Sequence, residues 1–173
     1  MSTEFTQHAA TGAHERATIT TSGPQLVITR AFPASADLVF EAMTNPEHIR
    51  RWWGAGHGTM TTCEVDLRVG GAWHFAQTAD SSGEEVSFSG RYKEIERPGH
   101  LVHTERFDNI DSPYSLVDTT YVEHEGTTTL RAVITYDSPE TVKSVIDSGM
   151  EHGLQSSYDA IDDVLAELAA AQS

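Results

Sequence analysis

The feature of this sequence that most constrains its fold is a long amphipathic segment near the C-terminal end. The segment opens with Ser138-Pro139-Glu140, a helix cap followed by proline at the first helical position. Apolar residues then recur three or four positions apart as far as Leu168. The spacing predicts one helix over residues 139–168 that is apolar along one side for about eight turns. A stripe of that length has to be covered by an equally long apolar partner.

The partner is predicted between residues 60 and 136, where apolar and polar residues alternate with a period of two. Trp73 and Phe75 share one face of a strand in this stretch, and Phe88 and Tyr92 share one face of another. Turn sequences rich in Gly, Asp, Asn and Pro separate the alternating runs. The pattern indicates about six antiparallel strands.

A strand and two short helices precede this meander. Residues 25–32 are rich in β-branched side chains and end at Pro33, and Ser35 is placed to cap a helix over residues 36–44. A second helix is predicted from Pro46 to the Trp52-Trp53 pair. The order β-α-α-β6-α predicts an α+β helix-grip architecture, in which a curved antiparallel sheet wraps around the C-terminal helix and leaves a cavity between them.

The chain has the length of one domain, at 173 residues. We expect that domain to span residues 24–170. Residues 1–23 are rich in Thr, Ser, Ala and His, which predicts a flexible N-terminal segment with a short strand over residues 17–20.

The charge balance excludes several classes of partner. Eleven Lys and Arg face 26 Asp and Glu, which gives a net charge of -15 and a field that repels nucleic acids and anionic membrane surfaces. No apolar run approaches the roughly 20 residues of a membrane span. The single cysteine, Cys63, is typical of a reducing compartment, so we expect a cytoplasmic protein.

Four motifs carry a resemblance to a known family. They are residues 34–53, with Asn45-Pro46-Glu47 before Trp52-Trp53; residues 66–73, with Asp-x-Arg-x-Gly-Gly; residues 89–95; and Gly-Met-Glu-His-Gly at 149–153. As a set they resemble the bacterial proteins related to the C-terminal domain of the activator of the ninety-kilodalton heat-shock protein ATPase, within the START-like (SRPBCC, helix-grip) superfamily. The resemblance covers roughly residues 25–168. It implies a domain that binds small apolar molecules or a protein partner, usually without demonstrated catalysis.

Aromatic side chains give the strongest argument for a ligand. Paired rings on neighbouring strands, and tryptophans where the short helices meet the sheet, predict an aromatic-lined interior. Core filling alone explains Trp53, Trp73 and Phe75 equally well. The predicted ligand-binding residues are Trp53, Trp73, Phe75, Phe88, Tyr92, Met150, Leu154 and Tyr158, of which Tyr92 or Tyr158 would orient the ligand.

Catalytic, metal and cofactor sites are not expected. His100 and His103 are three apart in a predicted strand and point to opposite faces, and no His-Glu-x-x-His is present. The glycine loop at 54–58 lacks a following Lys-Ser/Thr, so it reads as a rim loop and not a phosphate site. Cys63 is expected to be a buried small hydrophobe.

Acid–base chemistry would need a titratable side chain that points into the cavity. The candidates within strands are His103, Glu105, Asp118 and Glu123, and we expect each of them to face water.

The predicted function is non-catalytic binding of a small apolar or aromatic molecule in the internal cavity, by a monomer or homodimer and without a cofactor. One alternative is a chaperone-linked adaptor or stress-response co-chaperone that acts through its surface. A further alternative is a cyclase-like or hydrolase-like enzyme that uses a cavity carboxylate or histidine. The sequence leaves the identity of the ligand open.

Overall fold

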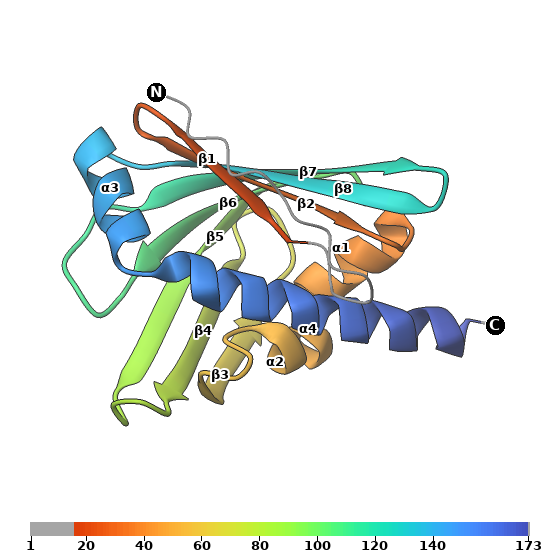
Figure 1. Ribbon diagram of the computed structural model, residues 1–173, viewed down its shortest axis with the longest axis horizontal. Helices are drawn as coiled ribbons and strands as arrows, with labels where there is room; N and C mark the ends of the chain where they lie inside the picture. Colours follow the sequence, from red (N-terminus) through yellow and green to blue (C-terminus); the bar gives the residue numbers. More distant parts are fainter. Residues whose placement is uncertain (1–15, 173) are drawn as a thin grey trace.

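The computed structural model describes residues 16–172, and these form one curved antiparallel sheet with helices on one side (Figure 1). The strands are β1 Thr18–Ser22, β2 Gln25–Phe32, β3 Gly58–Val65, β4 Ala72–Ala79, β5 Glu85–Glu96, β6 His100–Phe107, β7 Ser115–His124 and β8 Thr127–Thr135. Their order across the sheet is β1-β2-β8-β7-β6-β5-β4-β3. The six-strand meander expected after the helices is therefore confirmed as β3 to β8, and the helix-grip architecture is the one observed.

The N-terminal part of the chain adds an edge strand to this sheet. β1 pairs antiparallel with β2 along its whole length, from Thr18 opposite Thr29 to Ser22 opposite Gln25. The short strand expected near residues 17–20 is thus present within the segment predicted to be flexible. Residues 1–15 of that segment lie outside the described residues.

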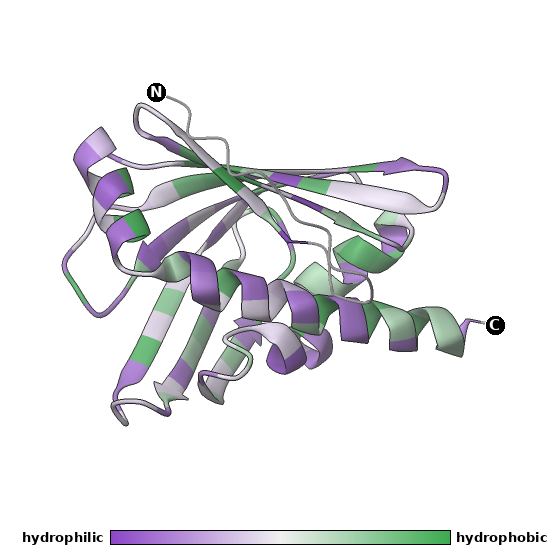
Figure 2. Cartoon of the chain, in the orientation of Figure 1, coloured by the Kyte–Doolittle hydropathy of each residue, from purple (hydrophilic) through white to green (hydrophobic). Residues whose placement is uncertain are grey.

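Each strand of the sheet has an inner face toward the helices and an outer face away from them. In β2 every second side chain is buried, namely Leu26, Ile28, Arg30 and Phe32. The same alternation continues in β7 and β8. The inner face carries the main core, because side chains two apart on a strand point to the same side. In Figure 2 the strands and α4 (Met150–Ala171) correspondingly alternate between hydrophilic and hydrophobic residues.

The two short helices begin at the positions that their capping residues predict. In α1 (Ala36–Thr44) the Ser35 hydroxyl accepts a hydrogen bond from the Leu38 N–H at 3.3 Å. In α2 (Pro46–Trp52) the Asn45 side chain accepts from the Glu47 N–H at 3.0 Å, with Pro46 in the first turn. The Trp52 indole N–H donates to the Ala42 carbonyl at 2.8 Å, which locks the two helices together.

The C-terminal helical segment differs from the prediction in one respect: it is two helices. α3 (Pro139–Asp147) ends before Ser148, and α4 begins after Gly149. Gly149 has a φ of 83°, in the left-handed region that favours glycine, and such a residue ends an α-helix. α3 lies at one end of the sheet and α4 runs across the inner face (Figure 1). The single helix predicted over residues 139–168 is therefore wrong as a continuous element.

A buried ion pair holds α4 against the sheet. The Arg30 guanidinium on β2 donates to both carboxylate oxygens of Asp162 on α4, at 3.1 and 2.5 Å. The Arg30 side chain is only 1% exposed, and a second α4 carboxylate, Asp159, lies 3.8 Å away. Two turns before Asp162, the Gln155 side chain donates to the Ala17 carbonyl at 3.0 Å and accepts from the Ala17 N–H at 2.9 Å.

We predict that Asp162→Asn lowers the free energy of unfolding by about 3 kcal/mol, because it leaves the Arg30 charge buried with one distant partner. The matched control is Asp163→Asn, at the next and exposed position of α4, which should change stability by less than about 0.5 kcal/mol. Urea denaturation of both variants measures the difference. Equal losses would show that the ion pair does not hold the helix.

Candidate ligand-binding face

Five aromatic rings meet on the inner face of β4, β5 and β6. We call this set the aromatic cluster: Trp53, Trp73, Phe75, Phe88 and Phe107. Trp53 follows the end of α2 and packs edge-to-face on Phe75 and Phe88, with ring centroids 5.8 and 5.9 Å apart. Trp73 lies 4.8 Å from Phe75, and Phe88 lies 5.1 Å from Phe107. These separations are those of attractive aromatic pairs, so the cluster is a single packed unit.

A glycine explains how Trp73 reaches its place. A Cβ atom at Gly90 on β5 would lie 1.8 Å from the Thr104 carbonyl oxygen and 2.8 Å from the Trp73 indole nitrogen. Because Gly90 has no side chain, the Trp73 indole N–H extends over β5 and donates to Thr104 O at 3.1 Å. Gly90, which belongs to the sequence motif at residues 89–95, therefore positions a tryptophan of the cluster.

The predicted ligand-binding residues divide into two groups by burial. Trp73, Tyr92 and Tyr158 are core residues with exposures of 4–6%. The other five are partly buried hydrophobics packed against the core: Trp53, Phe75, Phe88, Met150 and Leu154. Four of the eight meet in the aromatic cluster. Tyr158 instead packs on Phe32 of β2, at 5.8 Å between centroids.

Two polar side chains on β6 join the inner face, against expectation. His103 packs on Trp73 and Tyr92 at 5.5 and 6.3 Å, and its Nε2 atom lies 4.0 Å from the Glu105 carboxylate. Both residues share the face of Phe107, two and four positions along the strand. The prediction that His103 and Glu105 face water is therefore wrong, because strand parity and not polarity decides which way they point.

Burial shifts the pKa of Glu105. Its side chain keeps a third of its surface accessible, but it lies deep enough in the protein that desolvation raises its pKa from 4.5 to about 7. Its charge contributes in turn, after burial, to the raised pKa values of Tyr136 and Tyr158. Glu105 thus lies on the inner face close to two tyrosines.

Burial acts in the opposite direction on His103. Desolvation lowers the pKa of its imidazole to about 4, so the ring is neutral at pH 7. Its Nδ1 atom is buried and has no hydrogen-bond partner within the described part of the chain. The pair therefore consists of an imidazole that is neutral at pH 7 and a carboxyl group whose pKa is about 7.

The other two acidic candidates differ from each other: Asp118 lies as expected on the outer face, whereas Glu123 has the inner-face parity of Tyr121 and is exposed near the end of β7. The Asp118 carboxylate accepts a hydrogen bond from His100 Nε2 at 2.8 Å on the outer face. The Glu123 carboxylate accepts from the Ala36 N–H at 2.7 Å, where it caps α1. His100 and His103 lie on opposite faces of β6, as their spacing predicted.

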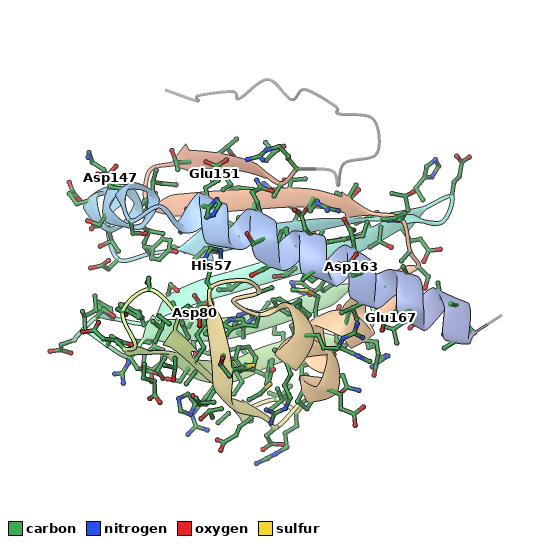
Figure 3. All side chains as sticks on the ribbon, turned by 60° about the horizontal axis from the view of Figure 1, so that its bottom comes forward. His57, Asp80, Asp147, Glu151, Asp163 and Glu167 are labelled. Atoms are coloured by element: carbon green, nitrogen blue, oxygen red, sulfur yellow. The ribbon has the colours of Figure 1, made fainter. Side chains whose placement is uncertain are left out.

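The glycine loop lies between α2 and β3 and contacts α4. Gly54 and Gly56 adopt φ values of 64° and 80°. The His57 imidazole lies 3.4 Å from the Ser156 hydroxyl and 5.2 Å from the His152 ring, both on α4. Figure 3 shows His57 directly below α4, on the side opposite Glu151. The loop is thus a rim that joins the β3 edge of the sheet to the first turns of α4.

Two recesses are found on the outer face of the sheet. One, of about 550 Å³, lies over β4, β5 and β6 next to Tyr114, and the other, of about 240 Å³, lies over β2, β7 and β8. Neither involves α4. Neither recess is therefore the cavity that the sequence predicted between the sheet and the C-terminal helix. The partly buried residues among those predicted to line it pack against the core instead.

Among residues 16–172, no three His, Cys, Asp or Glu side chains are grouped so that they could hold a metal ion. Cys63 is buried, as expected, and burial raises the pKa of its thiol.

Within residues 16–172, no helix is both long and apolar enough to cross a bilayer.

We predict that Glu105→Gln stabilises the protein at pH 8 by about 1 kcal/mol and much less at pH 5.5. Between pH 4.5 and 7 the folded protein keeps a proton on Glu105 that the unfolded chain has released, so stability falls as the pH rises. Urea denaturation at several pH values measures this effect. The exposed Glu96→Gln on β5 is the control and should give a difference that does not vary with pH. The same pH-independence at Glu105 would refute its raised pKa.

Comparison with solved structures places this fold among bacterial proteins. A crystal structure from Rhodobacter sphaeroides matches with a TM-score of 0.76 and 28% identity, over 84% of this chain and 93% of that one. Protein Ms6760 from Mycobacterium smegmatis matches with a TM-score of 0.74 and 28% identity, over 82% and 90%. A solution structure from Arthrobacter aurescens has a TM-score of 0.74 at 24% identity, over 83% and 87%, and supports the fold alone.

A comparison with curated proteins found no match. A family model does match, that of the activator of Hsp90 ATPase homolog 1-like protein, over residues 33–166. That range runs from α1 through most of α4 and includes the aromatic cluster and the His103–Glu105 pair. The chain therefore belongs to the family of activator of Hsp90 ATPase homolog 1-like proteins.

Proposed function

We propose that the protein binds a small apolar or aromatic molecule on the inner face of the sheet, against the aromatic cluster and the first turns of α4. One observation carries this proposal. Trp53, Phe75 and Phe88 point toward the helix side and contact one another, yet they stay only partly buried. Aromatic surface of this kind gains free energy, at about 25 cal/mol per Å², when a ligand removes it from water.

The surroundings of the cluster support the same reading. Met150 and Leu154 are on the first turns of α4 and are also partly buried. The rim loop with His57 contacts this part of α4 through His152 and Ser156. A flat molecule would lie between rings on the sheet side and flexible aliphatic side chains on the helix side, with the rim loop beside it.

We expect a neutral fluorescent probe, N-phenyl-1-naphthylamine, to bind saturably and to accept energy from Trp53 and Trp73. Phe88→Ala removes a ring from the centre of the cluster and should weaken binding by about tenfold, because it deletes about 1–2 kcal/mol of apolar contact. Val122→Ala, on the outer face, is 62% exposed in the parent protein and should leave the dissociation constant unchanged. Fluorescence titration compares the three proteins.

Two results would contradict the proposal. The first is non-saturable binding of the probe to the parent protein. The second is an equal loss of affinity in the Phe88 and Val122 variants, because the probe would then bind the general surface. Native mass spectrometry of protein purified gently from its own host provides an independent measurement, in which a bound mass should disappear on denaturation.

Acid–base catalysis on the same face is a second candidate, and the His103–Glu105 pair favours it. A carboxyl group with a pKa of about 7 is matched to proton transfer at neutral pH. His103, with a pKa of about 4, is a weak base and would act by hydrogen bonding. Glu105→Gln separates the two functions, since a binding protein keeps its affinity for the neutral probe whereas an enzyme loses turnover of the molecule found by mass spectrometry.

A further inference from the structure

We propose that the inner face selects an organic cation, namely an amine with an apolar or aromatic body whose ammonium group pairs with Glu105 beside the aromatic rings. This inference rests on the proposed function, because it assigns a charge to the ligand of the same face. It is carried by the partners that Glu105 has, by the rings around it and by the charge of the chain.

Glu105 has no cationic partner within the described residues. The ionisable side chain beside it is His103, whose Nε2 atom lies 4.0 Å from Glu105 Oε2 and whose ring is neutral at pH 7. Asp162 on α4 is instead paired with Arg30, whose Nη1 and Nη2 atoms donate to its two carboxylate oxygens. A carboxylate deep in a protein is costly unless a positive charge compensates it. A bound ammonium group would supply the missing charge.

The groups around Glu105 suit a cation better than an anion. His103 lies between the Glu105 carboxylate and two aromatic rings. The centroids of the Trp73 and Tyr92 rings are 5.5 and 6.3 Å from the centroid of its imidazole. Ring faces are electron-rich and attract ammonium groups, most strongly where water is excluded. Arg30 on the inner face of β2 is a cation that could attract an anionic ligand. It is already paired with Asp162, so it is not available to one.

The overall charge acts in the same direction. At a net charge of -15 the protein attracts cations over long distances and repels carboxylates and phosphates. The preference of the site for an amine and the field of the whole chain therefore reinforce each other.

The affinity for an amine should depend on pH. An ammonium group pairs with the ionised form of Glu105, so affinity rises as the pH increases from about 6 to 8. The titratable groups that face Glu105 are His103 on the same strand, Tyr136 after β8 and Tyr158 on α4. His103 is neutral and both tyrosines stay protonated throughout this range, so of these groups Glu105 is the one that changes its charge.

The test uses three probes that share one body: 4-phenylbutylamine, 4-phenylbutanol and 4-phenylbutyrate. Calorimetric titration at pH 8 should show the amine binding about tenfold more tightly than the alcohol, and the carboxylate most weakly. Glu105→Gln should remove the preference for the amine and leave the affinity for the alcohol unchanged. Glu96→Gln removes one negative charge from an exposed position of β5 and should keep the preference.

The outcomes separate this inference from the proposed function. If the amine and the alcohol bind the parent protein equally, the ligand is not selected for charge, although the inner face still binds. If the carboxylate binds best, the inference is wrong in sign. If none of the three binds, both proposals fail. The pH profile of the parent protein decides the matter without a variant, because an amine affinity that stays flat between pH 6 and 8 overturns the role of Glu105.

Discussion

The position of α4 depends on the bidentate contact between Arg30 and Asp162. Arg30 projects from the inner face of β2, and an arginine at such a position needs a carboxylate in a fixed geometry. That requirement sets both the rotation and the longitudinal position of α4. Tyr158, one turn before Asp162, is thereby brought onto Phe32, and Leu154 one turn earlier is directed to the inner face. The side chains that α4 directs toward the sheet therefore depend on one ion pair.

Hydrophobic periodicity and capping residues were sufficient to predict the fold. The alternation in residues 60–136 indicates directly which side chains share a face of a strand. Ser35 and Asn45 begin helices because their side chains accept hydrogen bonds from backbone N–H groups of the first turn. The interruption of the C-terminal helix was missed for a physical reason. Apolar spacing is compatible with helix on both sides of Gly149, and it carries no information on the sign of φ at the glycine between.

The apolar half of the candidate site was predictable and the polar half was not. Trp73, Phe75 and Phe88 were found because large rings at alternate positions belong to a buried face. Polarity alone predicts that the side chains of His103 and Glu105 face water. Phe107 gave a contrary signal, because residues 103, 105 and 107 of one strand must point the same way, and a large ring at the third position indicates the interior. Polar residues whose parity matches the core are candidates for function.

The attachment of α4 is uneven along its length, and this follows from the break at Gly149. From Gln155 to Leu165 the helix is held by buried contacts. Residues 150–154 follow the break and are held by the contact of His152 with the rim loop and by an exposed ion pair between Arg16 and Glu151. The helix is therefore held firmly in its middle and more weakly at the end that carries Met150 and Leu154. Opening this end costs less free energy than displacing the clamped part. The first turns of α4 can therefore separate from the sheet while the ion pair at Arg30 stays intact.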